Sequence, residues 1–434
     1  MHKTFRPWQV DQNLLLPPSV HDFVPADHPA HFVRALVCEE LDLSAIIDSY
    51  DEARGYPPYD PRMMTALLLY GYSRGLYASR RLALACEERL DFMAVTALNR
   101  PDFRTISDFR KRHLQALGGL FVQVLRLCQR AGLVKLGHVA LDGTKIKANA
   151  SKHKAMSYGR MVKAEAELSA EVAGWLAAAE AADAQDDAEH GAARRGDEMP
   201  DWIRDKDKRL GKIRQAKAEL EAEARAEAEK KAARPKTYRG GRKPKTPPGQ
   251  PKDAAQRNFT DPESRIMKGR DGFIQGYNAQ AAVDEAHQVI VAQSLSNNAS
   301  DQAELVPLVE GIKANTGRKP REVSADVGYC SEANLEALKD RRIRGYVATG
   351  RQKHPASGDA QRRGPQTEAM RQRLRRAGHR SRYRLRKQTV EPVFGQMKQA
   401  RGFRQFLLRG IDKVRAEWTL LCTVHNLLKL AKTA

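Results

Sequence analysis

Apolar residues recur every three or four positions through much of the first 130 residues. The spacing is clear in RMMTALLLYGYSRGL and in LQALGGLFVQVLRLCQRAGL, and it places one apolar stripe on a helix. Between them, NRPDFRTISDFRKRH has Pro101 and Asp102, residues typical of a helix start, before Ile106 and Phe109. We predict an all-helical N-terminal domain over residues 1–130. Its short basic helix is compatible both with DNA binding and with a solvated surface.

The period changes after Gly137. HVALDGTKIKANAS begins with a short apolar run and becomes polar, as a buried central strand does, and this places Asp142 at the strand end. GFIQGYNAQAAVDEAHQVIVAQSLS reads as a β-hairpin, REVSADVGYCSEAN as a strand, turn and helix, and RGYVATGR as a last short strand. This alternation predicts an α/β fold with a mixed sheet flanked by helices, over residues 131–154 and 259–434.

Two further segments interrupt or follow this pattern. Residues 155–233 are rich in Ala, Glu, Lys and Arg in two helical runs, which predicts an inserted helical hairpin. Residues 234–258 have the Pro, Gly and Lys content of a basic flexible linker. From about Arg382 to Leu430 the apolar spacing is helical again.

The net charge of the chain gives the first indication of a binding partner. The chain of 434 residues has a formal net charge of +22, and residues 341–434 carry 24 Lys and Arg against 5 Asp and Glu. This excess predicts a polyanionic partner, most simply nucleic acid. The start of the sequence has no apolar signal-peptide core, no stretch is apolar enough for a membrane helix, and the five cysteines show neither paired nor zinc-site spacing. We expect a cytoplasmic, nucleoid-associated bacterial protein with no membrane contact.

Three acids occupy positions where charge is out of place. Asp142 and Asp326 follow predicted strands, and Glu391 lies beside an apolar helix face with Pro392 in the first turn. Acids at the ends of neighbouring strands can converge, and half-buried carboxylates need a cation, for which oxygen ligands favour Mg²⁺ or Mn²⁺. Two ions about 4 Å apart could activate a water or a 3′-hydroxyl in phosphodiester displacement. Each acid could equally be an ordinary turn or helix-cap residue.

Several stretches together resemble one family. They are PDFRTISDFRKRH, ALDGTKIKANAS, NFTDPESRIMK, GYNAQAAVD, SADVGYCSEAN and YRLRKQTVEPVFGQMKQARGFRQFLLRG. In these stretches the chain resembles the DDE transposases of bacterial insertion sequences, whose catalytic domain has a ribonuclease H-like fold. The resemblance implies that Asp142, Asp326 and Glu391 are the catalytic acids and metal ligands, for two ions of Mg²⁺ or Mn²⁺. It also implies an N-terminal DNA-binding domain, double-stranded DNA as partner and a homodimer in the DNA complex.

Many members of that family carry a signature of Tyr, Arg, Glu and Lys separated by two, three and six residues. Here Tyr383, Arg386, Glu391 and Lys398 are separated by two, four and six, so Lys387 could equally take the arginine's place. Lys398 and Glu391 would share one helix face, although Lys398 could also be one exposed lysine among many. The predicted DNA contacts are Tyr383, Arg386, Lys398, Arg401, Arg404 and Arg110.

Other polar residues near the predicted sheet are expected to be mostly structural. Asp261 and Asn278 are the ones expected nearest the active site, and either Asp301 or Ser300 is expected near the cap of a helix; the other two candidates are Gln280 and His287. The predicted function is metal-dependent cleavage and transfer of DNA strands at terminal inverted repeats. The alternatives are a catalytically inactive DNA-binding derivative and a ribonuclease H-like nuclease acting on other substrates.

Overall fold

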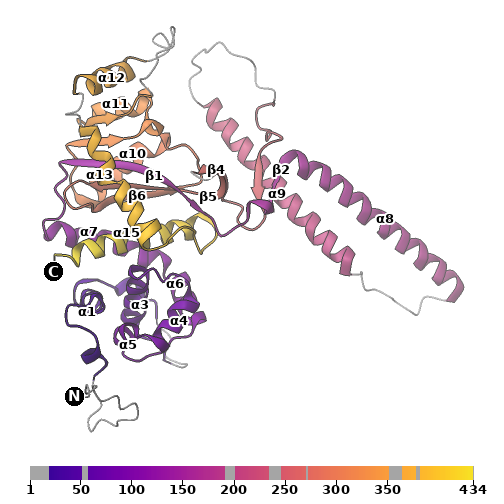
Figure 1. Ribbon diagram of the computed structural model, residues 1–434. Coiled ribbons are helices and arrows are strands. Elements are labelled where there is room, and N and C mark those ends of the chain that lie inside the picture. The colour runs from indigo at the N-terminus through magenta and orange to yellow at the C-terminus, as the bar shows by residue number, and fades with distance from the viewer. Residues whose placement is uncertain are drawn as a thin grey trace, which may run out of the picture.

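A mixed sheet lies at the centre of the molecule, with helices on both of its faces (Figure 1). The computed structural model describes residues 19–50, 57–190, 201–233, 246–269, 272–350, 364–377 and 382–433. The N-terminal helices form a group beside the sheet, and two long helices extend away from it. The predicted fold class is confirmed. No helix in the described ranges is both long and apolar enough to cross a membrane.

The N-terminal part is helical wherever it is described. Asp102 caps the predicted basic helix by accepting hydrogen bonds from the amides of Arg104 (2.7 Å) and Thr105 (3.2 Å). The helices are α1 (Pro29–Ala35), α2 (Ser44–Ile47), α3 (Pro61–Ser73), α4 (Ser79–Glu88), α5 (Leu90–Thr96), α6 (Phe103–Arg112) and α7 (Leu114–Arg130), with short helical turns at Val20–Phe23 and Leu36–Glu40.

The central sheet has strand order β4-β5-β1-β7-β8, and β6 pairs with β5 beside β4. Strands β1 and β5 are antiparallel, as are β5 and β6, whereas β1, β7 and β8 run parallel. The strands are β1 (His138–Lys147), β4 (Arg265–Gly269), β5 (Gly272–Asp284), β6 (Ile290–Ser296), β7 (Glu322–Ala325) and β8 (Arg344–Val347), and the covering helices include α10 (Leu305–Thr316), α11 (Glu332–Asp340) and α12 (Pro365–Ala377). The hairpin expected from the sequence is β5–β6.

Strand β1 is longer than its apolar run suggests, so Asp142 lies within the strand and not at its end. Pairing with β7 is recorded as far as Ala140 opposite Ser324, whereas pairing with β5 continues to Lys147 opposite Gly276. The antiparallel neighbour holds the polar half of β1 in extended form. Asp142 therefore lies where β1 loses its neighbour on one edge only, and Asp326 follows directly after β7 on that edge.

The continuous helix expected from Arg382 to Leu430 is broken into shorter pieces. Helix α13 (Leu385–Thr389) ends before α14 (Glu391–Gly395), which has Pro392 in its first turn as predicted, and a π-helical turn, η9 (Gln396–Ala400), follows. The chain then turns through Gly402 and Gly410, both with positive φ, before α15 (Ile411–Leu430). Glycine adopts such angles without the steric cost that a Cβ brings.

The insertion is a pair of helices, α8 (Tyr158–His190) and α9 (Asp201–Ala232), which extend away from the sheet (Figure 1). A two-stranded sheet lies at their base, where β2 (Ala155–Ser157) pairs with β3 (Gln256–Asn258). Met161, Ile213 and Leu220 form a small apolar cluster between the helices. Residues 234–245 of the predicted linker lie outside the described residues, while its last three residues form β3 and so differ from a flexible segment.

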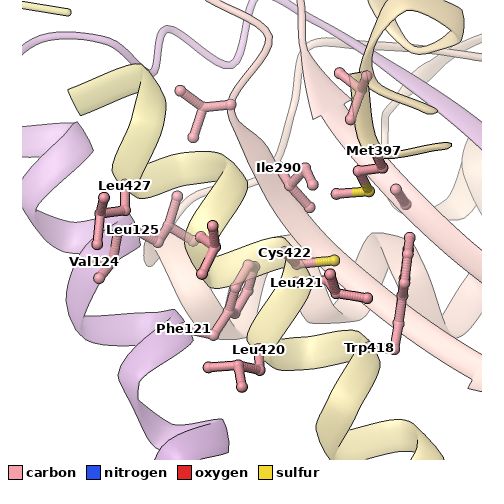
Figure 2. Packing of buried hydrophobic residues seen from close by; sticks show 14 of the residues in the cluster. Phe121, Val124, Leu125, Ile290, Met397, Trp418, Leu420, Leu421, Cys422 and Leu427 are labelled. Carbon is pink, nitrogen blue, oxygen red and sulfur yellow. The ribbon is translucent and has the colours of Figure 1, made fainter. Parts of the chain in front are cut away.

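One hydrophobic core joins the N-terminal helices to the sheet. Figure 2 shows Phe121, Val124 and Leu125 of α7 packed against Leu420 and Leu427 of α15. Trp418 of α15 is fully buried and its indole N–H donates to the carbonyl of Gln280 on β5 (3.1 Å). Helix α7 thus belongs to the packing of the catalytic half, although it precedes β1 in sequence.

The segment after Glu391 also contacts the N-terminal helices. The Tyr77 hydroxyl donates to the carbonyl oxygen of Arg401 (2.9 Å), and the Tyr77 ring meets Phe403 edge to face at 4.9 Å. Gly75 lies against the same carbonyl with φ of 76°, and a Cβ there would come within 2.8 Å of the oxygen. This contact connects the N-terminal helices to the end of the helical segment that begins with Glu391.

Gly75→Ala tests this contact, with Gly132→Ala as its matched control. Both glycines have a left-handed φ, but a Cβ on Gly132 would meet no described atom within 4 Å. We expect Gly132→Ala to lower the free energy of unfolding by about 1 kcal/mol from backbone strain alone. Gly75→Ala should lower it by about 2–3 kcal/mol, because the carbonyl must also move. Equal losses in chemical denaturation would contradict the close approach.

Candidate active site

The guanidinium of Arg386 connects two of the three predicted acids. Its Nη1 lies 2.6 Å from Oδ2 of Asp142 and its Nη2 lies 3.2 Å from Oε1 of Glu391. Arg386 and Asp142 are largely buried, whereas half of the Glu391 side chain is exposed. The helix break at Val390 produces this arrangement, since it lets α13 direct Arg386 toward β1 while α14 begins with Glu391.

Asp142 and Asp326 project from neighbouring strands next to this ion pair. Oδ1 of Asp142 accepts from the amide of Gly143 (2.9 Å), and Oδ1 of Asp326 accepts from the amide of Gly328 (2.8 Å). Burial raises the pKa of Asp142 to about 6; Arg386 opposes this shift and the charge of Asp326 adds to it. Burial also raises the pKa of Asp326, and the amide of Gly328 opposes that shift. The two carboxylates repel each other and favour a cation between them.

Lys398 reaches the same strand from the other side of the Glu391 helix. Its ammonium donates to the hydroxyl of Thr144 and to the carbonyl oxygen of Lys145 (2.9 Å). Burial lowers its pKa, as do the nearby charges of Arg404 and Lys145. Lys398 lies in the π-helical turn η9, which follows α14, so Lys398 and Glu391 do not lie on one continuous α-helix. In this structure the Lys398 ammonium is therefore hydrogen-bonded to β1.

A second polar cluster lies beside Asp326. Oδ1 of Asp301 accepts from the Lys145 ammonium (2.9 Å), the Asn278 amide (2.6 Å) and the Gln280 amide (2.7 Å). Asp301 occupies the N-cap position of the turn Gln302–Glu304, but its side chain makes no capping hydrogen bond. The Asp301 side chain is turned toward these donors instead, while the Ser300 hydroxyl, the other expected cap, accepts from the amide of Gln302 (3.4 Å).

The predicted DNA contacts divide into inward-facing and outward-facing residues. Arg110 is 5% exposed, and its guanidinium donates to the Tyr72 hydroxyl (3.0 Å) and the Tyr77 carbonyl (2.9 Å). Arg401 lies 3.3 Å from Nδ1 of His425, inside the contact between the domains. Both guanidinium groups thus make contacts inside the molecule, where the sequence predicted contacts with DNA.

Arg404, Tyr383 and Lys387 lie nearer the surface. Arg404 is exposed and bonds Oε1 of Gln399 (2.5 Å), and Lys387 is exposed on α13. The Tyr383 ring lies beneath Arg386, with 6.0 Å between the guanidinium carbon and the ring centroid. The sequence left open whether Arg386 or Lys387 takes the arginine's place in the signature. In the structure Arg386 is the side chain that contacts the acids.

The remaining polar candidates are distributed differently from expectation. Asn278 and Gln280 lie beside Asp301 in the active centre. Asp261 is buried and accepts from the Tyr277 hydroxyl (2.9 Å) and the Gly410 amide (3.2 Å), so it supports the chain before α15. His287 is exposed in the β5–β6 turn.

The carboxylates of Asp142 and Glu391 suit a hard divalent cation, on the condition that Arg386 moves away from them. Within the described residues, no group of three or more Asp, Glu, His or Cys side chains is close enough together to hold a metal ion. The reason is local: the Arg386 guanidinium lies between Asp142 and Glu391 as the cation that neutralises them. Carboxylate oxygens are ligands that Mg²⁺ and Mn²⁺ accept, so the acids suit these ions once Arg386 moves away.

Two family comparisons agree with this geometry. The family described as transposase DDE domain matches residues 240–427, and the one described as transposase domain (DUF772) matches residues 18–112. The chain belongs to the DDE transposases. No curated protein and no solved structure matches it.

The matches cover two of the three acids of this transposase. Asp326 and Glu391 lie inside residues 240–427, whereas Asp142 precedes the insertion and lies outside both matched ranges. An ion pair with Arg386 connects Asp142 to the matched region. Sequence reasoning missed Lys145 altogether, although its place three residues after Asp142 in DGTK was a signal that could have found it.

The pKa of Asp142 predicts a pH dependence of stability. Its folded pKa of about 6 lies above the ordinary aspartate pKa of 3.8, so the folded protein holds this proton more tightly, and its stabilising contribution is lost as pH rises from about 4 to about 6. In EDTA, the unfolding free energy of Asp142→Asn minus that of the wild type should rise by about 3 kcal/mol over this range. The exposed Asp340→Asn is the control and should show a constant difference. A flat difference for Asp142→Asn would contradict the raised pKa.

Proposed function

We propose that this transposase binds the terminal inverted repeats of its own insertion sequence, cleaves DNA strands there and joins the freed 3′-hydroxyls to target DNA. The single observation that supports the catalytic part is that Arg386 bridges Asp142 and Glu391, while Asp326 follows the strand next to that of Asp142. The family match supports transposition in general. The basic C-terminal part of the chain supports a DNA substrate.

Asp142, Asp326 and Glu391 would hold Mg²⁺ or Mn²⁺, most simply as two ions. Bound there, the metal would lower the pKa of a nucleophilic water or hydroxyl and offset the charge of the leaving oxygen. The chain's own residues orient the acids: the amides of Gly143 and Gly328 fix one oxygen of each aspartate. Arg404, exposed beside Lys398, and Lys387 on α13 are positioned to contact the DNA backbone without reading bases.

Removing any one of the acids should separate binding from cleavage. Asp142→Asn, Asp326→Asn and Glu391→Gln should each lower strand cleavage of a plasmid carrying the DNA that flanks the gene by at least about a thousandfold. Binding to the same DNA should persist, because each change removes negative charge near a phosphate. Asp340→Asn, an exposed acid on α11, is the control and should cleave normally.

The products of that assay also distinguish the proposal from its rivals. Full cleavage by any one of the three acid variants in Mg²⁺ would rule out the metal assignment. Cleavage by the wild type without joining of labelled ends to target DNA would indicate a nuclease. Binding without metal-dependent nicking would indicate an inactive DNA-binding derivative.

Arg386 should compete with metal binding in the DNA-free protein. Its guanidinium uses oxygens of Asp142 and Glu391 that a metal needs, so a cation can bind these oxygens only when that contact opens. We expect Arg386→Gln to bind Mn²⁺ about tenfold more tightly than the wild type, because a charge-assisted contact no longer has to be broken. Isothermal titration or the electron paramagnetic resonance of free Mn²⁺ measures this affinity.

Lys387→Gln is the matched control for that experiment. It removes one positive charge from the neighbouring position on α13 without removing the ion pairs to the acids, so it accounts for the general change in electrostatic potential. Its Mn²⁺ affinity should stay within about twofold of the wild type. Equal or weaker binding by Arg386→Gln would show that the guanidinium does not occupy the metal position.

A further inference from the structure

Lys145 lies at the open edge of β1 next to the active acids. It follows Asp142 by three residues, so the alternation of the strand puts it on the opposite face from Asp142 and Thr144. The recorded pairing of β1 with β7 ends at Ala140, and Asp326 comes directly after β7 beside this edge.

Asp301 holds the Lys145 ammonium in a defined place. The carboxylate oxygen that accepts from Lys145 also accepts from the two amides of β5, at 2.6 Å and 2.7 Å. In the β1–β5 register Asn278 stands opposite Lys145, and Gln280 stands opposite Gly143. Three donors on one oxygen leave that oxygen little freedom, so the direction of the lysine is fixed by the sheet.

Two glycines make room for this carboxylate. A Cβ on Gly143 would come within 2.9 Å of Oδ1 of Asp301, and a Cβ on Gly328 would come within 2.9 Å of Oδ2. The same position on Gly328 lies 3.1 Å from Oδ1 of Asp326. Asp301 is therefore packed between the residue after the first catalytic acid and the turn that carries the second.

The pair of Lys145 and Asp301 differs from an ordinary exposed ion pair, because it is largely buried. Lys145 and Asp301 have side chains only 18% and 19% exposed, and the amides that support them are buried. An ammonium has three N–H donors, and one of them is directed to Asp301. Within the described part of the chain no second acceptor is found for this ammonium, whose side chain is 18% exposed, so its other N–H groups can donate to oxygens that approach from solvent. A phosphate diester above the acids presents such oxygens.

We propose that Lys145 is a catalytic residue that binds a non-bridging oxygen of the scissile phosphate, and that Asp301 is its positioning residue. This inference rests on the proposed function, because it assigns a substrate contact at the same active centre. Lys145 supplies positive charge on the Asp326 side of the site, opposite the Arg386 side. Because Asp301 and the β5 amides already order the lysine, much of its conformational freedom is lost before DNA binds.

The test separates cleavage from binding. End DNA is taken from the sequence flanking the gene; its affinity is measured by fluorescence anisotropy in Ca²⁺, and its single-turnover cleavage in Mg²⁺. Lys145→Gln should reduce the cleavage rate constant about a hundredfold, as the loss of one preorganised donor to a reacting oxyanion does. Affinity should fall less than about threefold, because many other cations contact the backbone. Lys145→Arg, which keeps the charge, should cleave within about tenfold of the wild type.

Asp301→Asn should reduce cleavage about tenfold, since Lys145 loses its charged anchor while the asparagine oxygen still accepts from the β5 amides. Because Asp301 acts through Lys145, the double variant Lys145→Gln/Asp301→Asn should cleave no more slowly than Lys145→Gln alone. Lys147→Gln is the matched control: Lys147 is exposed, lies on the same face of β1 two residues further on, and makes no ion pair among the described residues. It should cleave at the wild-type rate.

Each result has a definite meaning. Cleavage by Lys145→Gln within about threefold of the wild type would overturn the phosphate contact while the proposed function stands. A double variant slower than Lys145→Gln by the full Asp301→Asn factor would show that Asp301 is merely structural. A wild-type protein that does not cleave end DNA in Mg²⁺ would overturn the proposed function and this inference together. Thermal melting of each variant confirms that it is folded.

Discussion

Repulsion between carboxylates is the constraint on which the active centre depends. Asp142, Asp326 and Glu391 come from β1, from the turn after β7 and from the start of α14. Burial already raises the pKa of the two aspartates, so a third acid beside them requires a compensating cation. In this structure Arg386 supplies that charge, because the short helix α13 brings its guanidinium between Asp142 and Glu391.

The repulsion between carboxylates also explains why several cationic side chains surround these few acids. Arg386 lies on one side of the aspartates and Lys145 on the other, while Lys398 is bonded to the strand between them. A divalent ion can take the place of such a cationic side chain beside a carboxylate, and the side chain can instead bind a phosphate oxygen. The basic composition of the chain is thus partly a long-range attraction for DNA and partly a local balance of buried charge.

The helical N-terminal part and the sheet share one core, which has consequences for the site. Helix α7 packs on α15 (Figure 2). The Tyr77 hydroxyl donates to the carbonyl oxygen of Arg401, just after the helical segment that begins with Glu391. Arg110 and Arg401, which a reading of charge assigns to DNA, instead lie inside these contacts. Packed side chains thus connect the N-terminal helices to the segment that carries Glu391.

The sequence by itself determined the α/β class, the β5–β6 hairpin and the start of α6 at Asp102, because these depend on local periodicity and capping. Only the tertiary structure decided that Asp142 lies within its strand, that Arg386 and not Lys387 meets the acids, and that Asp301 holds Lys145. Each of those outcomes depends on contacts between segments far apart in the chain. Residues of identical chemistry become interior, catalytic or exposed according to which distant segment packs against them.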